Sequence, residues 1–197
     1  MFGGSLTKPI LKMLLPSLAP NGPACRIAVA KSTAEQADAR IALALDFVTR
    51  AGANIQVLPG SSRAYYSSTI DKIVVPAASD FIGTATSTPV EAFAGVVLHE
   101  LVHWTGHKNR LARTFGACHG DADYAKEELV AELGATFLCA DLGISTEPRA
   151  DHAQYLASWL QVLKDDKRLI IRAASQASKA AAYLHGLQTP ALVADAA

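Results

Sequence analysis

The strongest constraint in this sequence is an apolar segment, residues 88–106, whose start and end are both marked. Thr88 and Glu91 form a capping box around Pro89, and proline suits the first turn of a helix. Gly106 supplies the stop that commonly follows a helix. The residues between are mostly apolar, among them Phe93, Val96, Val97, Leu98, Leu101 and Val102. The pattern predicts one largely buried helix over this segment.

Three ionisable side chains interrupt the apolar helix, in the pattern His99-Glu100-Leu101-Val102-His103. Residues four apart return to the same face of an α-helix, so both imidazoles can reach one ion. Glu100 is rotated about 100° from His99 and about 60° from His103, so it can lie beside the ion without binding it. Burying these groups costs free energy unless something pairs with them. We therefore predict one Zn²⁺ ion with His99 and His103 as ligands, rather than two ordinary core histidines.

The same pattern predicts hydrolysis. Zinc lowers the pKa of a coordinated water from about 15.7 to near 7, which makes hydroxide available at neutral pH. Glu100 can accept the proton and pass it to a leaving amine. We therefore expect a zinc metallopeptidase that acts on a protein or peptide, with Glu100 as its catalytic residue.

A catalytic zinc site also needs a third protein ligand. The pattern HExxHxxGxxH fails here, because Gly106 is present but Asn109 stands where its last histidine is required. His107 is close in sequence, yet eight residues after His99 span about 12 Å on a continuous helix. His107 can therefore serve only if the chain turns sharply at Gly106.

A second helix, expected over 123–142, offers the other candidates for the third ligand. It carries Glu127, Glu128 and Glu132, of which the last two lie four apart and share a face. One of them can bind the metal while the other hydrogen-bonds a ligating histidine. We favour Glu128 as ligand, over Glu132 or Glu127, and expect Glu127 to be solvated. The plain alternative is a surface helix rich in acids.

The flanking segments predict a mixture of helices and strands. The expected elements are, in order, a helix at 32–50, strands at 54–58, 64–68 and 72–75, helices at 88–105 and 123–142, and two further helices at 150–164 and 165–185. This order is typical of an α+β domain, here residues 26–190. A flexible leader at 1–25 and a tail at 191–197 complete the chain.

Charge and cysteine content exclude other classes. Lys plus Arg and Asp plus Glu each total 18, so no global positive field attracts nucleic acid. The local basic group of Lys108, Arg110 and Arg113 is interpreted as solvated. Cys25, Cys118 and Cys139 are odd in number and widely spaced, which indicates reduced thiols in a cytoplasmic protein. No apolar run approaches the ~20 residues of a membrane span, so we expect no membrane partner.

Beyond these motifs, the sequence resembles a known family over residues 33–187. Residues 99–111 and 124–133 are similar to the metallopeptidase domain of ArdC-type antirestriction proteins, which also occurs in phage and plasmid polyvalent proteins. The resemblance implies a zincin fold of the gluzincin type, with a small mixed or antiparallel sheet packed on the HExxH helix. In that fold the second helix supplies a glutamate ligand, a role that maps onto Glu128, with Glu132 four positions later.

The resemblance carries two further expectations. It implies that the strand at 71–75 is an edge strand above the cleft, where an extended peptide can pair. ArdC proteins carry an N-terminal single-stranded-DNA-binding domain, for which this chain has only residues 1–32, so DNA binding is not carried over. The second function that we weigh is a non-catalytic antirestriction or DNA-associated binding protein with a structural or vestigial metal site.

Several side chains can stabilise a developing oxyanion, and the sequence does not choose among them. They are His119, Tyr124, His152 and Tyr155.

Overall fold

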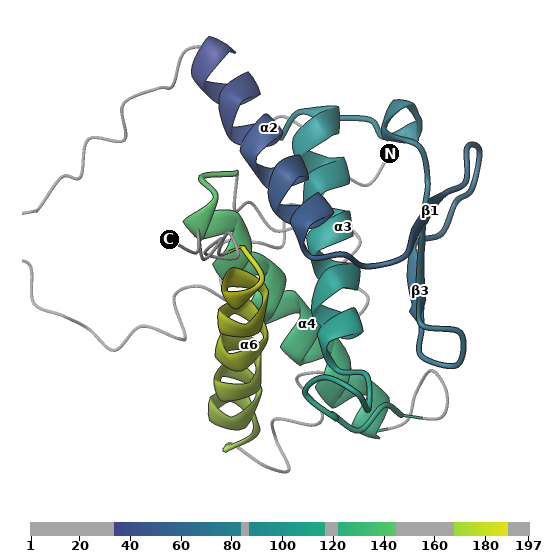
Figure 1. The fold of residues 1–197 in the computed structure, drawn as a ribbon, viewed down its shortest axis with the longest axis vertical. Coiled ribbons are helices and arrows are strands. Elements are labelled where there is room, and N and C mark those ends of the chain that lie inside the picture. Colours follow the sequence, from purple (N-terminus) through teal and green to yellow (C-terminus); the bar gives the residue numbers. More distant parts are fainter. Residues whose placement is uncertain (1–33, 84–86, 117–121, 145–167, 189–197) are drawn as a thin grey trace, which may run out of the picture. The chain divides into compact units, whose positions relative to one another are not determined.

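The computed structural model describes residues 34–83, 87–116, 122–144 and 168–188 (Figure 1). Its elements are α2 (Ala34–Arg50), β1 (Ile55–Val57), β2 (Tyr65–Ser67), β3 (Lys72–Val75), the 3₁₀ turn η1 (Ala78–Asp80), α3 (Pro89–Thr105), α4 (Ala122–Asp141) and α6 (Leu169–Gly186). These match the expected helices and strands to within a few residues. The predicted helix at 150–164, the leader and the tail lie outside the described residues.

The α3 helix begins and ends where its sequence signals are. The Thr88 hydroxyl accepts a hydrogen bond from the Glu91 amide at 3.3 Å, and the Glu91 carboxylate accepts one from the Thr88 amide at 2.7 Å. Gly106 caps the other end. Every residue from Val96 to Thr105 except His99 is buried, which confirms the prediction of a buried helix.

The three strands form one mixed sheet in the order β1-β3-β2. Ile73, on β3, pairs in parallel with Ile55 and antiparallel with Tyr66. The expectation of an edge strand at 71–75 is therefore wrong, because β3 is paired on both sides and offers no main-chain edge to a peptide. Sequence pattern shows only that β3 is buried, whereas its neighbours are set by pairing between distant segments.

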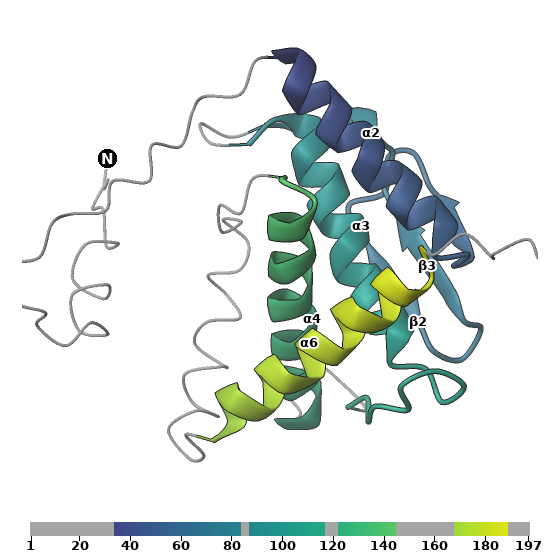
Figure 2. The same ribbon diagram turned by 60° about the vertical axis from the view of Figure 1, so that its left-hand side comes forward.

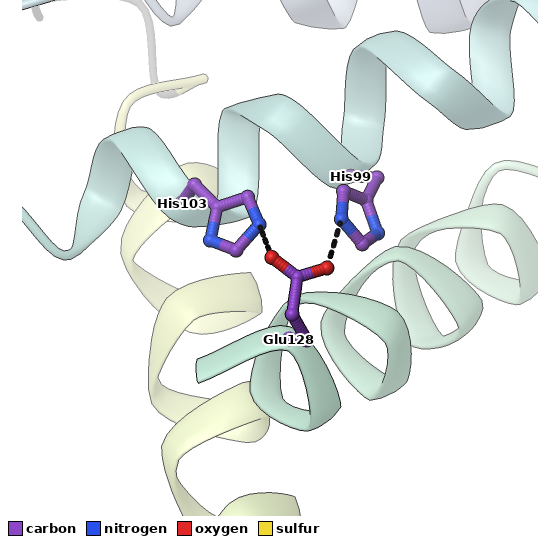
Figure 3. Close-up of side chains that lie close together, drawn as sticks. All are labelled: His99, His103 and Glu128. Carbon is purple, nitrogen blue, oxygen red and sulfur yellow. Dashed lines mark ion pairs between the residues drawn. The ribbon is translucent and has the colours of Figure 1, made fainter. Parts of the chain in front are cut away.

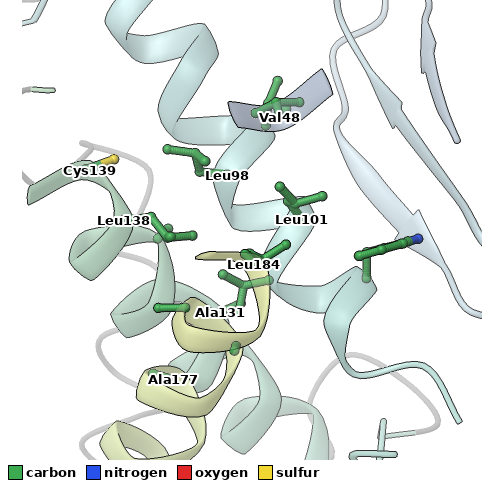
Figure 4. Packing of buried hydrophobic residues seen from close by; sticks show 14 of the residues in the cluster. Val48, Leu98, Leu101, Ala131, Leu138, Cys139, Ala177 and Leu184 are labelled. Atoms are coloured by element: carbon green, nitrogen blue, oxygen red, sulfur yellow. The ribbon is translucent and has the colours of Figure 1, made fainter. Parts of the chain in front are cut away.

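The core lies where α3 meets the other elements. Helix α3 packs against α2, α4, α6 and strands β2 and β3 (Figures 1 and 2). Leu98 and Leu101 of α3, Leu138 of α4 and Leu184 of α6 are fully buried and point into one cluster (Figure 4). Cys139 is buried with them, and burial raises the pKa of its thiol to about 11. The helix that carries the histidines is thus held from several sides.

Helices α3 and α4 approach closely at Gly134. A Cβ atom at this position would lie 2.9 Å from both Cγ atoms of Val102. The absence of a side chain therefore lets the two backbones come together, six residues along α4 from Glu128. This contact helps to set the distance between the faces that carry the candidate ligands.

The β2–β3 hairpin is tied to the loop after α3 by Arg110. Its guanidinium makes two hydrogen bonds to the Asp71 carboxylate and one to the Tyr66 hydroxyl. Its Nε donates to the Trp104 carbonyl at 2.5 Å, and its Cζ lies 3.9 Å from the centre of the Trp104 ring. Only 9 % of the Arg110 side chain is exposed, so our interpretation of it as a solvated cation is wrong.

We expect Gly134→Ala to destabilise the protein, although alanine favours helices. An overpacked contact costs about 1–3 kcal/mol, whereas replacing a helical glycine by alanine gains about 0.5–1 kcal/mol. Gly95 of α3 is the matched control, because a Cβ there meets nothing within 4 Å. Urea unfolding with metal removed should show a lower free energy of unfolding for Gly134→Ala and a higher one for Gly95→Ala. The same sign for both would contradict the close helix contact.

Asp71→Asn tests the charge of the Arg110 interaction. Asp71 has a φ of 48°, and asparagine tolerates this left-handed backbone. The hydrogen bond from Arg110 lowers the pKa of the Asp71 carboxyl, so its stabilisation is present at neutral pH and is lost as the pH falls through the folded-state pKa. Because 39 % of the side chain is exposed, we expect a loss of only about 0.5–1 kcal/mol at pH 7.

The measurement is the free energy of unfolding of wild type and Asp71→Asn at several pH values. The difference should shrink as the pH is lowered below about 4, the ordinary pKa of an aspartate. A difference that stays constant across this range would show that the charge contributes nothing.

Candidate metal site

Two histidines of α3 face one glutamate of α4 (Figure 3). Nε2 of His99 lies 3.6 Å from one Glu128 carboxylate oxygen, and Nε2 of His103 lies 3.4 Å from the other. A ligand atom from each of the three residues lies within 4.8 Å of the other two. The spacing of four on α3 puts both imidazoles on one face, and α4 brings the carboxylate to them.

These separations suit a shared divalent ion. Ligand atoms about 2.0–2.2 Å from one zinc ion in tetrahedral geometry lie roughly 3.3–3.6 Å apart. The contacts of His99 and His103 with Glu128 fall in this range, each with a different oxygen of the carboxylate, and one atom from each residue lies within 4.8 Å of the others. Two imidazole nitrogens and one carboxylate oxygen are also a donor set that zinc accepts, and they leave a fourth position open. The residues therefore fit a divalent metal.

Each imidazole has a second carboxylate on its other nitrogen. Nδ1 of His99 lies 3.4 Å from the Glu132 carboxylate, and Nδ1 of His103 lies 3.1 Å from that of Glu127. An acceptor at Nδ1 keeps the proton there and leaves the lone pair of Nε2 toward Glu128. Metal-ligating histidines in proteins almost always have such a partner.

Glu127 is the candidate whose surroundings differ from expectation. We expected a solvated side chain, but only 5 % of Glu127 is exposed. Glu127 and Glu128 are neighbours and thus about 100° apart on the helix, which lets one face the ion position and the other face the back of His103. The sequence analysis assigned a hydrogen-bonding carboxylate to only one of the two histidines. Because each ligating histidine needs such a partner, the lack of one for the other histidine could have pointed to Glu127.

Arg113 holds Glu127 from the loop after α3. Its Nε and Nη2 donate to the two Glu127 oxygens at 2.9 and 2.8 Å. Its Nη1 donates to the Thr105 hydroxyl at 2.8 Å, and Nη2 also donates to the Val102 carbonyl at 2.6 Å. Only 5 % of its side chain is exposed. The interpretation of Arg113 as a solvated cation is therefore wrong.

The electrostatics of the cluster favour positive charge between the carboxylates. Burial lowers the pKa of His103, but its hydrogen bonds with Glu127 and Glu128 outweigh this effect and raise the pKa to about 10. Burial raises the pKa of Glu128, and its bonds with the two imidazoles reverse the shift and lower it. A divalent cation satisfies the same carboxylate when the imidazoles are neutral, and its binding releases protons.

Glu100 lies on α3 beside the two histidines and is 7 % exposed. Its carboxylate makes no hydrogen bond or ion pair with any residue in the described part of the chain. Burying a carboxylate without a partner costs free energy, and a functional role is one explanation for keeping it. This position is compatible with the base that the sequence predicts, and that role stays a prediction.

The remaining candidates are not part of the convergent group. His107 is buried, and its Nδ1 accepts a hydrogen bond from the Asn109 amide at 3.3 Å. The backbone of Tyr124 packs against Gly116, where a Cβ atom would lie 2.2 Å from the Tyr124 nitrogen. His119, His152 and Tyr155 lie outside the described residues. The choice of an oxyanion-stabilising side chain, which the sequence leaves open, is not made by the described residues.

An α+β domain with HExxH on one helix and a glutamate from the next is a zincin-like arrangement, and comparison with known proteins agrees. The family model of the zincin-like metallopeptidases, MPTase-PolyVal, matches residues 43–176. The chain belongs to this family.

Two solved structures are similar to this chain. They are the Mn(II)-bound and metal-free crystal structures of the antirestriction protein ArdC from plasmid R388, at 39 % and 40 % identity and a TM-score of 0.60 each. They cover 79 % and 74 % of this chain. This chain in turn spans 53 % and 50 % of them, about half the ArdC length.

Curated relatives share the same region. The uncharacterised protein y4eC of Sinorhizobium fredii is 40 % identical over 72 % of this chain and 44 % of its own length. A DNA primase TraC of Escherichia coli is 37 % identical over 68 % of this chain but only 9 % of its own length. The region therefore occurs within much longer proteins. None of the helices in the described segments is long and apolar enough to cross a membrane.

Proposed function

We propose that this chain is a zinc-dependent peptidase. His99, His103 and Glu128 would hold the ion, Glu132 would orient His99, and Glu100 would be the catalytic base. The observation that carries the proposal is the convergence of two Nε2 atoms and one carboxylate, with a carboxylate behind each Nδ1. Zincin-like family membership supports it.

The side chains divide the work. When bound, the ion would acidify a coordinated water and polarise a substrate carbonyl. Glu100 would accept a proton and return it to the leaving amine. Glu127 and Glu132 would keep the Nδ1 protons in place, so that the basic nitrogens of His103 and His99 face the metal. The substrate would be a protein or peptide.

The donor set favours zinc among the divalent ions. Two imidazoles and one carboxylate match a common catalytic zinc set, whereas ions such as magnesium and calcium prefer sites made of oxygen ligands. The Mn(II)-bound structure of the related ArdC protein makes manganese the alternative to test beside it.

A second candidate function is antirestriction without catalysis. It is supported by the similarity to the ArdC antirestriction protein at 39 % identity. In that role the metal site would stabilise the fold or be vestigial, and Glu100 would not be needed. The two candidates therefore differ in what they require of one carboxylate.

Glu100→Gln separates the two functions. For a peptidase, removing the base should lower the rate of hydrolysis by roughly 10²–10⁴-fold, while zinc content and folding stay unchanged. The measurement is cleavage of a proteome-derived peptide library, followed by mass spectrometry. As a control, the same variant is tested for protection of an unmodified plasmid in a restricting host. If wild type and Glu100→Gln both protect the plasmid fully and neither cleaves any peptide, the binding role is favoured.

Metal analysis tests the ligand assignment. Glu128→Ala should remove one of three ligands, so the purified protein should lose most of its zinc. Glu132→Ala should keep the ion and bind it roughly 10–100-fold more weakly, as expected for the partner of a ligating histidine. The measurement is metal content by mass spectrometry with zinc affinity by chelator competition. Equal zinc content in wild type and Glu128→Ala would contradict the site.

A further inference from the structure

We propose that Arg113 is a positioning residue for the metal site: it holds Glu127 against His103 and thereby sets the affinity for the ion. This inference rests on the proposed zinc site. Arg113 touches none of the three candidate ligands by a described hydrogen bond, and it acts through the Glu127 carboxylate. It would also couple the ends of two helices that supply those ligands.

The geometry joins α3 and α4 through one side chain. The guanidinium binds both oxygens of Glu127, on α4, and the same group binds the Val102 carbonyl at the end of α3. Val102 directly precedes His103, whose Nδ1 is 3.1 Å from Glu127. One cation therefore fixes both the carboxylate behind His103 and the main chain directly before it.

Burial makes this arrangement costly to break. Glu127 and Arg113 each expose only 5 % of their side chains. A buried carboxylate that loses its cation is no longer held in place and moves toward solvent. This movement weakens the hydrogen bond that orients His103.

Arginine is required here for its shape as well as its charge. A planar guanidinium can serve two carboxylate oxygens, a hydroxyl and a carbonyl at once, in directions fixed by its plane. A lysine ammonium has three donors at one point and cannot reach all four acceptors. Arg113→Lys should therefore restore only part of the function of Arg113.

Gly106 gives this side chain its room. The φ of Gly106 is −75°, which any residue adopts. A Cβ atom there would lie 2.9 Å from Nη2 of Arg113 and 2.8 Å from Cζ of Phe115. Gly106→Ala should therefore push the guanidinium away from Glu127 without removing its charge. It disturbs the contact by a second route and also displaces the Phe115 ring, whose centre lies 6.4 Å from that of His103.

The experiment measures zinc affinity by competition with a chromophoric chelator, for the whole chain and its variants. We expect the affinity to fall roughly 10–100-fold in Arg113→Met, less in Arg113→Lys, and also in Gly106→Ala. Lys126→Met is the matched control, because it removes a cation adjacent to Glu127 in sequence. The Lys126 side chain is 43 % exposed and pairs with Asp123. That variant should keep the wild-type affinity.

Two further measurements exclude a purely structural role. The absorption spectrum of the Co²⁺-substituted protein should change in Arg113→Met, because His103 is no longer held in one orientation. The double variant Gly106→Ala, Arg113→Met should bind zinc no more weakly than Arg113→Met alone, since both changes break one contact.

The outcomes distinguish failure of the proposed role of Arg113 from failure of the proposed zinc site. Unchanged zinc affinity in Arg113→Met and Gly106→Ala, with wild type binding zinc, would overturn the inference and leave the metal site standing. Equal weakening by Lys126→Met would overturn it too, because general charge would then explain the effect. Wild-type protein that binds no zinc would overturn both proposals.

Discussion

The structure depends on satisfying a group of ionisable side chains buried between two helices. Glu127, Glu128 and His103 are each at most 9 % exposed, beside the apolar core that α3 and α4 share. Charges in such surroundings are stable only when they are paired. The two imidazoles face carboxylates on both of their nitrogens, so the helices must stay in one register. A slip of α4 by a single residue would rotate Glu128 about 100° away from both histidines.

Local sequence signals predicted much of this arrangement, because they act within one helix. The capping box at Thr88 and the spacing of four from His99 to His103 needed no knowledge of distant segments. Helical periodicity also predicted that Glu128 and Glu132 would face the same side, and both lie against the imidazoles. Whether they act as ligand and partner stays a prediction, since geometry alone does not test it.

The failures share a different cause, which is contact between segments far apart. The position of β3 between β1 and β2 follows from pairing that no single strand encodes. Helical periodicity predicts a solvated Glu127, because it points away from the face that Glu128 and Glu132 share. Its cation comes from an irregular loop that includes Ala112 at a φ of 50°, a conformation that periodicity does not predict.

That loop explains why two arginines three residues apart have different roles. Arg110 reaches the hairpin at Asp71, whereas Arg113 turns back to Glu127 on α4. Both also bind main-chain carbonyls of α3, at Trp104 and Val102. The last turn of the histidine-bearing helix is thus fixed on one side to the sheet and on the other to α4.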